Sequence, residues 1–264
     1  MLSLAAHLLA AGLWGRALPA EGQEIRFRPT VVREPHGGVI RGDVHRRQLA
    51  LIFTGDEYAE SASAILDILQ RRGHKAGFFV TGRFARQPAL RPIIRRMIDE
   101  GHYVGPHSDM HLLYCDWSDR SKSLVTQAAF AADLQNNVAA LQSIGALAAR
   151  QAVLFVPPYE WYNAEQVKWA EELGVKLVNF TPGSGSNRDY IREGERRYQS
   201  SQQILEEILA YERRDPLGLN GFLLLLHLGS GRKDPFHLQL STLCQELSER
   251  GYSFVRVDEL LIAD

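Results

Sequence analysis

Two adjacent carboxylates follow the first long apolar run of the chain. The run Leu49–Phe53 reads LALIF, and Thr-Gly-Asp-Glu comes next, so Asp56 and Glu57 stand directly after it. Carboxylates at the end of a buried strand serve as metal ligands or as proton acceptors. In α/β folds the catalytic groups gather beyond the C-terminal ends of the strands. The ends of the other strands should therefore carry the rest of a site.

A histidine pair follows the third apolar run. His107 and His111 are four residues apart in HSDMH, a spacing that places both imidazoles on one face if the segment forms a helical turn. With Asp56 they would make a His₂-carboxylate metal site with open positions, as catalytic sites have. The donor set favours Zn²⁺, and Co²⁺, Ni²⁺ or Fe²⁺ are alternatives. The simpler interpretation is two solvated loop histidines.

A third histidine, His227, directly follows the most apolar run, LLLL. An imidazole that faces a metal site from a strand end is a suitable general acid or base near neutral pH. Asp189 or Asn187 would orient it. The alternative is a neutral histidine bonded to the backbone.

Apolar runs and amphipathic patterns alternate from residue 48 to the end of the chain. Strands joined by helical crossovers form parallel sheets, and continuously apolar strands are covered on both faces. This pattern predicts an α/β domain, either doubly wound or a barrel. The expected strands cover residues 49–53, 76–80, 103–105, 152–156, 175–180, 221–226 and 252–257, and the expected helices cover 61–73, 89–101, 125–145, 163–174, 201–213 and 235–250.

The composition excludes some partners. A net charge of −1 over 264 residues gives no basic excess for nucleic acid. Neither a G-x-G-x-x-G after the first strand nor a G-x-x-x-x-G-K-[ST] is present, so nucleotide binding has no support. Cys115 and Cys244 are far apart in sequence, and buried thiols explain them best.

The N-terminus differs from the rest of the chain. An apolar stretch, LSLAAHLLAAGLWG, is followed by small residues, as in a secretory signal. We predict a signal peptide over residues 1–20, an extension over 21–47 and the main domain over 48–264. The protein would then be exported, to the periplasm or beyond the cell, with no transmembrane segment. A short helix packed on the domain is the alternative.

Several motifs together resemble a known family. HSDMH matches the pattern H-[ST]-x-x-H, VPPY (156–159) matches R-x-P-Y except at its first position, and LLH (225–227) matches L-x-H. These motifs, in this order, are similar to those of the polysaccharide deacetylases of carbohydrate esterase family 4, over residues 49–261. The resemblance implies a distorted (β/α)₇ barrel. FTGDE resembles the first motif of a subgroup, the cellulase-linked N-acetylglucosamine deacetylases.

The chain departs from the family pattern in two places. Thr54 and Gly55 stand where the family has two aspartates, a general base and a metal ligand, and Val156 replaces the arginine that pairs with that base. The loss of both partners is coherent, because an arginine without its carboxylate would be an unpaired charge.

Other carboxylates would have to take over these roles. Asp56, one residue later in the chain, is then the expected metal ligand. Glu57 or Glu160 would act as the base, and Asp109 is a further candidate.

The resemblance implies removal of an N-acetyl or O-acetyl group from a sugar. The metal, held by Asp56, His107 and His111, would polarise the acetyl carbonyl and activate water. The backbone N–H of Tyr159 would help to hold the oxyanion, and His227 would protonate the leaving amine.

Substrate contacts are expected in the loops after the third, fourth and fifth strands. Glu160, Trp161 and Asp189 are predicted to contact the substrate, and Thr181 to shape the acetyl pocket. Aromatic side chains would form a platform for the sugar, although loop packing explains Trp117 equally well. The candidates are Tyr114, Trp117, Tyr159, Trp161 and Tyr162.

Two other functions remain open. The altered first motif favours a catalytically impaired, glycan-binding pseudo-deacetylase, and the same site would also suit an O-acetyl carbohydrate esterase. A serine hydrolase has no support, since no G-x-S-x-G elbow is present. The sequence leaves the oligomeric state open.

Overall fold

The computed structural model describes residues 26–148 and 151–263. The predicted signal peptide lies outside this range. The strands are β1 (Val32–Arg33), β2 (Val39–Arg41), β3 (Gln48–Gly55), β4 (Gly77–Val80), β5 (Tyr103–Pro106), β6 (Leu154–Phe155), β7 (Lys176–Leu177), β8 (Phe222–His227) and β9 (Ser253–Phe254). The α-helices are α1 (Ala62–Arg72), α2 (Gly82–Arg86), α3 (Arg91–Asp99), α4 (Gln127–Ser143), α5 (Ala164–Glu172), α6 (Ser201–Arg214), α7 (His237–Glu249) and α8 (Val257–Leu261).

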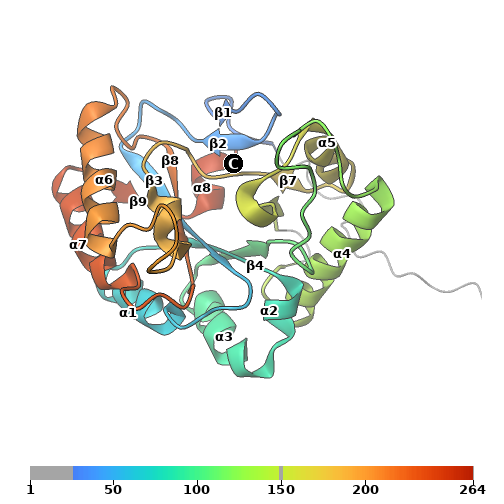
Figure 1. The fold of residues 1–264 in the computed structure, drawn as a ribbon, viewed down its shortest axis with the longest axis horizontal. Helices are drawn as coiled ribbons and strands as arrows, with labels where there is room; N and C mark the ends of the chain where they lie inside the picture. The colour runs from blue at the N-terminus through green and yellow to red at the C-terminus, as the bar shows by residue number, and fades with distance from the viewer. Residues whose placement is uncertain (1–25, 149–150, 264) are drawn as a thin grey trace, which may run out of the picture.

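The strands form a curled sheet with the helices around it (Figure 1). The main sheet has the order β1-β2-β8-β3-β4-β5, with β9 paired to β3, and β6 and β7 form a second, parallel pair. This pair spans the gap between the two ends of the main sheet. The Val156 N–H donates to the carbonyl of Pro106, the last residue of β5, and Val39 of β2 forms a parallel bridge with Val178. The strands thus close into an irregular ring, which confirms the predicted distorted (β/α)₇ barrel.

The last expected strand is shorter than predicted, and the predicted extension adds strands to the sheet. Of the expected last strand, 252–257, only Ser253–Phe254 pairs, at the base of β3, and α8 begins at Val257. Asp258 and Glu259 in the first turn of α8 favour a helix start there. The short β2 pairs antiparallel with β8 instead, so part of the predicted extension 21–47 belongs to the sheet.

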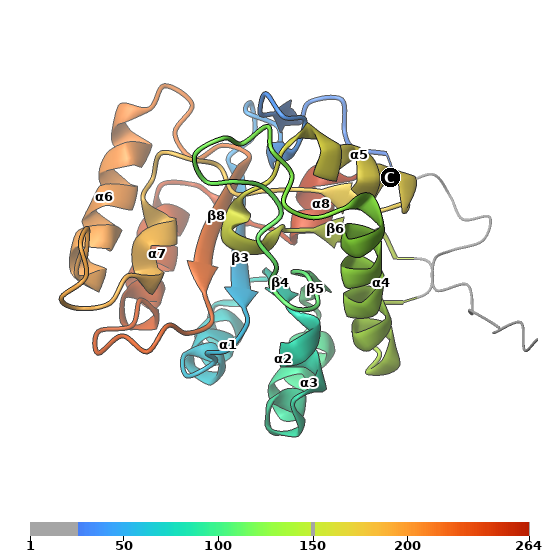
Figure 2. The ribbon, with the colours of Figure 1, turned by 45° about the vertical axis from the view of Figure 1, so that its right-hand side comes forward.

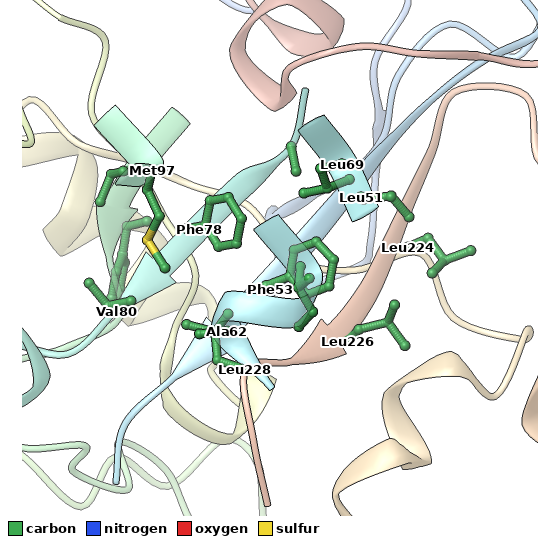
Figure 3. Close-up of a cluster of buried hydrophobic side chains, with 14 of the residues drawn as sticks. Leu51, Phe53, Ala62, Leu69, Phe78, Val80, Met97, Leu224, Leu226 and Leu228 are labelled. Carbon is green, nitrogen blue, oxygen red and sulfur yellow. The ribbon is translucent and has the colours of Figure 1, made fainter. Parts of the chain in front are cut away.

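Period-2 alternation along the central strands builds two apolar layers. Leu51 and Phe53 of β3 point outward, with residues of β4 and β8, against the helices α1 and α3 (Figure 3). Ala50 and Ile52 point the other way and pack inside the ring. Both faces of β3 are therefore covered, which explains why its sequence is continuously apolar.

The six long helices expected from the sequence all form, with ends within about two residues of their predicted bounds. The N–H of Gly73, a left-handed cap, closes α1 on the Gln70 carbonyl. Cys115 and Cys244 are buried free thiols, as predicted. Within residues 26–148 and 151–263, no helix has the length and apolar character needed to cross a membrane.

Candidate active site

A cavity of about 780 Å³ opens at the C-terminal ends of the central strands. Strands β3 and β8 run side by side (Figure 2), and Thr54 is in register with His227, so both strands end at the same level. Most of the predicted site residues meet on the wall of this cavity although they come from separate segments of the chain. These are Asp56, Glu57, His107, His111, Tyr159, Glu160, Trp161 and His227.

The two histidines of HSDMH lie in an irregular loop, so the expected helical turn is wrong. Ser108 and His111 both have positive φ, 74° and 57°. Asp133 of α4 holds this loop in place: it accepts hydrogen bonds from the Ser108 hydroxyl (2.6 Å), the Tyr114 hydroxyl (2.7 Å) and the Met110 N–H (3.0 Å). The His111 N–H in turn donates to the Ser108 hydroxyl oxygen (2.9 Å). The buried carboxylate thereby fixes the backbone on which His111 sits.

A second residue of α4 fixes the other histidine. The His107 N–H donates to the Asn137 side-chain oxygen (2.8 Å), and the Asn137 amide donates to the Val80 carbonyl (3.2 Å). Asn137 lies four residues after Asp133, so both face the histidine loop from one side of the helix. Neither Asp133 nor Asn137 is among the site residues predicted from the sequence. The sequence feature that could have indicated them is two polar side chains, four residues apart, on the apolar face of α4.

The position and the protonation of the two imidazoles suit metal binding. His107 donates its Nδ1–H to the Val156 carbonyl (2.8 Å), which leaves Nε2 free, as in many metal-binding histidines. The ring centroids of His107 and His111 are 5.1 Å apart. Burial, with the neighbouring His111, lowers the pKa of His107 to about 3, and burial also lowers the pKa of His111. Both rings are therefore neutral at pH 7, the state that binds a metal.

Asp56 has a partner that the sequence analysis missed. Arg83, just after β4, forms a two-pronged ion pair with both carboxylate oxygens of Asp56, and the Thr81 hydroxyl donates to one of them (3.0 Å). Burial alone would raise the pKa of Asp56, but the Arg83 hydrogen bonds, with the charge of His111 and the Thr81 hydroxyl, lower it on balance. An arginine from α2 thus pairs with the first-motif carboxylate, in place of the one that Val156 cannot supply.

This ion pair bears on the predicted metal site. Within the part of the chain that the structure describes, no three His, Cys, Asp or Glu side chains are grouped closely enough to hold a metal ion. His107 and His111 fit a metal in position and protonation, whereas Asp56 would have to turn from Arg83 to join them. A three-ligand site of Asp56, His107 and His111 therefore stays a prediction.

The remaining candidate carboxylates lie in different surroundings. Glu57 is at the rim of the cavity, with its side chain 64% exposed and 3.5 Å from Arg83. Asp109 is bound by both terminal nitrogens of Arg86, at 2.7 and 3.0 Å, and is not part of the cavity wall. This ion pair makes Asp109 a structural residue and contradicts its candidacy as the base.

Asp189 orients His227, as one of the two sequence alternatives proposed. Its carboxylate contacts the imidazole Nδ1 at 2.6 Å and accepts the His227 backbone N–H at 2.9 Å. Burial lowers the pKa of His227, but the charge and hydrogen bond of Asp189 outweigh that effect and raise it on balance. Asp189 itself is buried and lies behind the histidine, where a role in direct substrate contact has no support.

Aromatic side chains form one end of the cavity. Trp117 and Trp161 stack with ring centroids 5.6 Å apart, and Tyr159 meets Trp117 edge to face at 5.5 Å. Trp117 is 58% exposed and Tyr159 is 45% exposed, so their faces are open to a ligand. Tyr159 also contacts His111, with centroids 4.4 Å apart. The platform thus adjoins the histidine pair.

Two residues predicted to lie at the substrate are structural instead. Tyr114 is fully buried and donates to Asp133, so it supports the histidine loop from below. The Thr181 hydroxyl donates to the Ile40 carbonyl and accepts the Leu223 N–H (2.9 Å). These bonds join β2 to β8, and Thr181 does not line the cavity.

Comparison with known proteins agrees with this geometry. The chain is 25% identical to a peptidoglycan-N-acetylglucosamine deacetylase of Bacillus cereus, over 85% of this chain and 93% of that protein. Solved structures share the fold, and two of them illustrate the range of functions. One is a carbohydrate esterase family 4 pseudoenzyme from Bacillus anthracis (TM-score 0.66, 19% identity, 86% of this chain and 69% of that chain). The other is a family 4 acetyl xylan esterase from Clostridium thermocellum with a cobalt ion (TM-score 0.63, 23% identity, 81% and 89%).

The profile of one protein family, polysaccharide deacetylase, matches residues 41–178. This match covers more than half of the chain and runs from β2 through β7, so it includes the first carboxylates, the histidine loop and the aromatic segment after β6. The chain belongs to the polysaccharide deacetylase family.

Proposed function

We propose that the protein hydrolyses acetyl groups, foremost N-acetyl groups, from an acetylated carbohydrate. The observation that carries this proposal is the meeting of three imidazoles in one cavity: the neutral pair His107 and His111, and His227 with its raised pKa and its Asp189 partner. Two neutral imidazoles suit a metal, and a protonated one suits a leaving amine. Family membership supports the same chemistry.

The residues of the cavity divide the work of amide hydrolysis. When bound by His107 and His111, with Asp56 as the expected third ligand, a divalent ion would supply a Lewis acid for the acetyl carbonyl; Zn²⁺ is expected, and Co²⁺ or Ni²⁺ are alternatives. His227 donates its proton to the departing nitrogen. The proton of the attacking water passes to a carboxylate, for which Glu57 and Glu160 are the candidates on the wall.

The aromatic platform supports a sugar substrate. Trp117 and Tyr159 are exposed beside the histidine pair, and such rings pack against the apolar faces of sugars. Trp161 supports Trp117 by stacking on it, and the Arg120 guanidinium lies 4.4 Å from the centroid of the Trp161 ring. The Bacillus cereus relative acts on the N-acetylglucosamine of peptidoglycan, as its name states, and we propose a cell-wall glycan of that class as the first substrate to test. A substrate outside the cytoplasm agrees with the predicted export signal.

Acetate release tests the proposal directly. The purified chain is incubated with N-acetylated chito-oligosaccharides, peptidoglycan fragments and O-acetylated xylan, and free acetate is measured. Release from the N-acetylated substrates is expected, with a large loss in His227→Ala and none in the exposed His45→Ala. Release from xylan alone would make the protein an O-acetyl esterase.

One observation favours a second function, glycan binding without catalysis. Both oxygens of Asp56 are engaged by Arg83, and Thr54 and Gly55 supply no carboxylate. A pseudo-deacetylase would bind the same oligosaccharides through the aromatic platform and release no acetate from any of them.

A further inference from the structure

The segment after β6 has an unusual backbone at two consecutive residues. Tyr159 and Glu160 both adopt left-handed φ, 58° and 52°, in the short 3-10 turn Pro158–Glu160. Residues with a Cβ rarely adopt this conformation, and glycine adopts it freely. Two such residues in a row are strained and persist only where their surroundings enforce the conformation, which is common at functional sites. The presence of glutamate rather than glycine at position 160 therefore needs an explanation.

Backbone hydrogen bonds hold Glu160 in this conformation. Its N–H donates to the Pro157 carbonyl (3.0 Å), and its own carbonyl accepts the Asn179 side-chain amide (2.9 Å). The next residue, Trp161, donates its N–H to the Pro158 carbonyl (3.2 Å). The turn is thus fixed from both sides, and the Glu160 side chain is presented to the cavity as part of its wall.

The surroundings of the Glu160 carboxyl are those of a proton-exchanging group. His227 of β8 and Asp189 of the 3-10 helix η3 (Ser186–Tyr190) interact electrostatically with the Glu160 carboxyl. Tyr190 of η3 has its ring centroid 5.2 Å from that of His227, and the charge of Glu160 helps to raise the pKa of Tyr190. Burial raises the pKa of Glu160 to about 7, with His227 opposing this and Asp189 adding to it. On the side of β3, the charge of Asp56 is paired with Arg83.

Glu57, the other candidate, also lines the cavity but lies in more open surroundings. Its side chain is 64% exposed at the rim and shares Arg83 with Asp56. Its carboxylate is therefore largely hydrated, whereas Glu160 is only partly exposed and its backbone is held by the turn.

We propose that Glu160, not Glu57, is the catalytic carboxyl that takes the proton of the attacking water, while His227 protonates the leaving amine. This inference rests on the proposed deacetylase function. As the water oxygen bonds to the acetyl carbon, one water proton passes to the Glu160 carboxylate. As the carbon–nitrogen bond breaks, His227 gives its Nε2 proton to the amine. Transfer of the proton from Glu160 to His227 then restores both groups, and acetate and amine are the products.

A charge-removing substitution tests this role. Glu160→Gln should lower kcat by roughly 10²–10⁴-fold with KM changed little, because general-base help has about that value. The acidic limb of the kcat/KM profile, near pH 7 in the wild type, should disappear. Glu206→Gln, on the exposed face of α6, is the matched control and should keep both rate and profile. The inference is overturned if Glu57→Gln, and not Glu160→Gln, removes the rate and the limb.

A second substitution separates catalysis from folding. Glu160→Gly relieves the left-handed strain, so its Tm should rise by about 2–4 °C while its activity is lost. A purely structural Glu160 would instead give a lower Tm with activity retained in the folded fraction.

The outcomes also separate this inference from the proposed function. If the wild type releases no acetate from any acetylated carbohydrate, the proposed function fails, and the catalytic role of Glu160 fails with it. If the wild type releases acetate and Glu160→Gln matches it in rate and pH profile, only the assignment of Glu160 fails. Infrared titration without substrate adds an independent check: a carboxyl that titrates near pH 7 should be present in the wild type and absent in Glu160→Gln.

Discussion

At the scale of single residues, charge pairs decide what each group of the site can do. Asp189 contacts both the imidazole and the backbone N–H of His227, so one buried carboxylate sets the direction and the protonation of that ring. Arg83 binds both carboxylate oxygens of Asp56 and lowers the pKa of that carboxyl. His227 is thereby kept ready to give up a proton, and Asp56 is kept ionised.

Asp189→Asn should change the pH dependence of catalysis. Asp189 raises the pKa of His227, so the imidazolium persists to higher pH, and activity that needs this acid falls as pH rises through that pKa. Without the charge, the alkaline limb of kcat/KM should move to lower pH, and kcat should fall roughly 10–100-fold. Asn187→Ala, at the other residue considered for this role, should leave the limb in place. A limb unmoved in Asp189→Asn would contradict the assignment.

The same substitution has a stability signature with a fixed sign. A histidine whose folded pKa is raised adds stability below its unfolded pKa and loses that contribution as pH rises through the folded pKa. The difference in Tm between wild type and Asp189→Asn should therefore be larger at pH 5 than at pH 9.

At the scale of elements, α4 builds the histidine site from behind. Asp133 and Asn137, four residues apart and both buried, bind the loop and the backbone of His107. A loop with two residues of positive φ would not hold its shape without such bonds. The helix therefore acts as a rigid support for the two imidazoles.

A pair of neighbouring asparagines tests this support. Asn137→Ala removes two buried hydrogen bonds and leaves the His107 N–H with only its longer bond to the Val80 carbonyl (3.2 Å), so it should lower the free energy of unfolding by about 1–3 kcal/mol. Asn136→Ala, one residue earlier on the exposed face of the same helix, should change it by less than about 0.5 kcal/mol. Urea unfolding of the two variants measures both values. Equal effects would show that α4 does not anchor the loop.

At the scale of the whole molecule, the features that could be predicted from the sequence are the central strands, from hydrophobic periodicity, and the cavity, from the position of polar residues at strand ends. Apolar runs such as Leu49–Phe53 mark the central strands, and polar residues at the strand ends mark the cavity, because parallel strands bring those ends together. His107, His111 and His227 were found in this way.

The features that the sequence does not reveal depend on contacts between distant segments. The three residues of β2 are too few to show a period, yet they close the ring through Val39 and Arg41. Arg83 meets Asp56 only because β3 and β4 end side by side. The left-handed backbone conformation of Glu160 cannot be predicted from a glutamate in the sequence.

Metal removal tests the central claim, a metal-assisted deacetylase site, most directly. The purified chain is stripped with a chelator, reconstituted with Zn²⁺ or Co²⁺, and assayed for acetate release from N-acetylated chito-oligosaccharides, with bound metal measured on the same samples. We expect about one metal ion per chain, activity that is lost on stripping and restored by the metal, and loss of both bound metal and activity in His107→Ala but not in His45→Ala. Acetate release that is equal in stripped and reconstituted protein, or unchanged in His107→Ala, would contradict it.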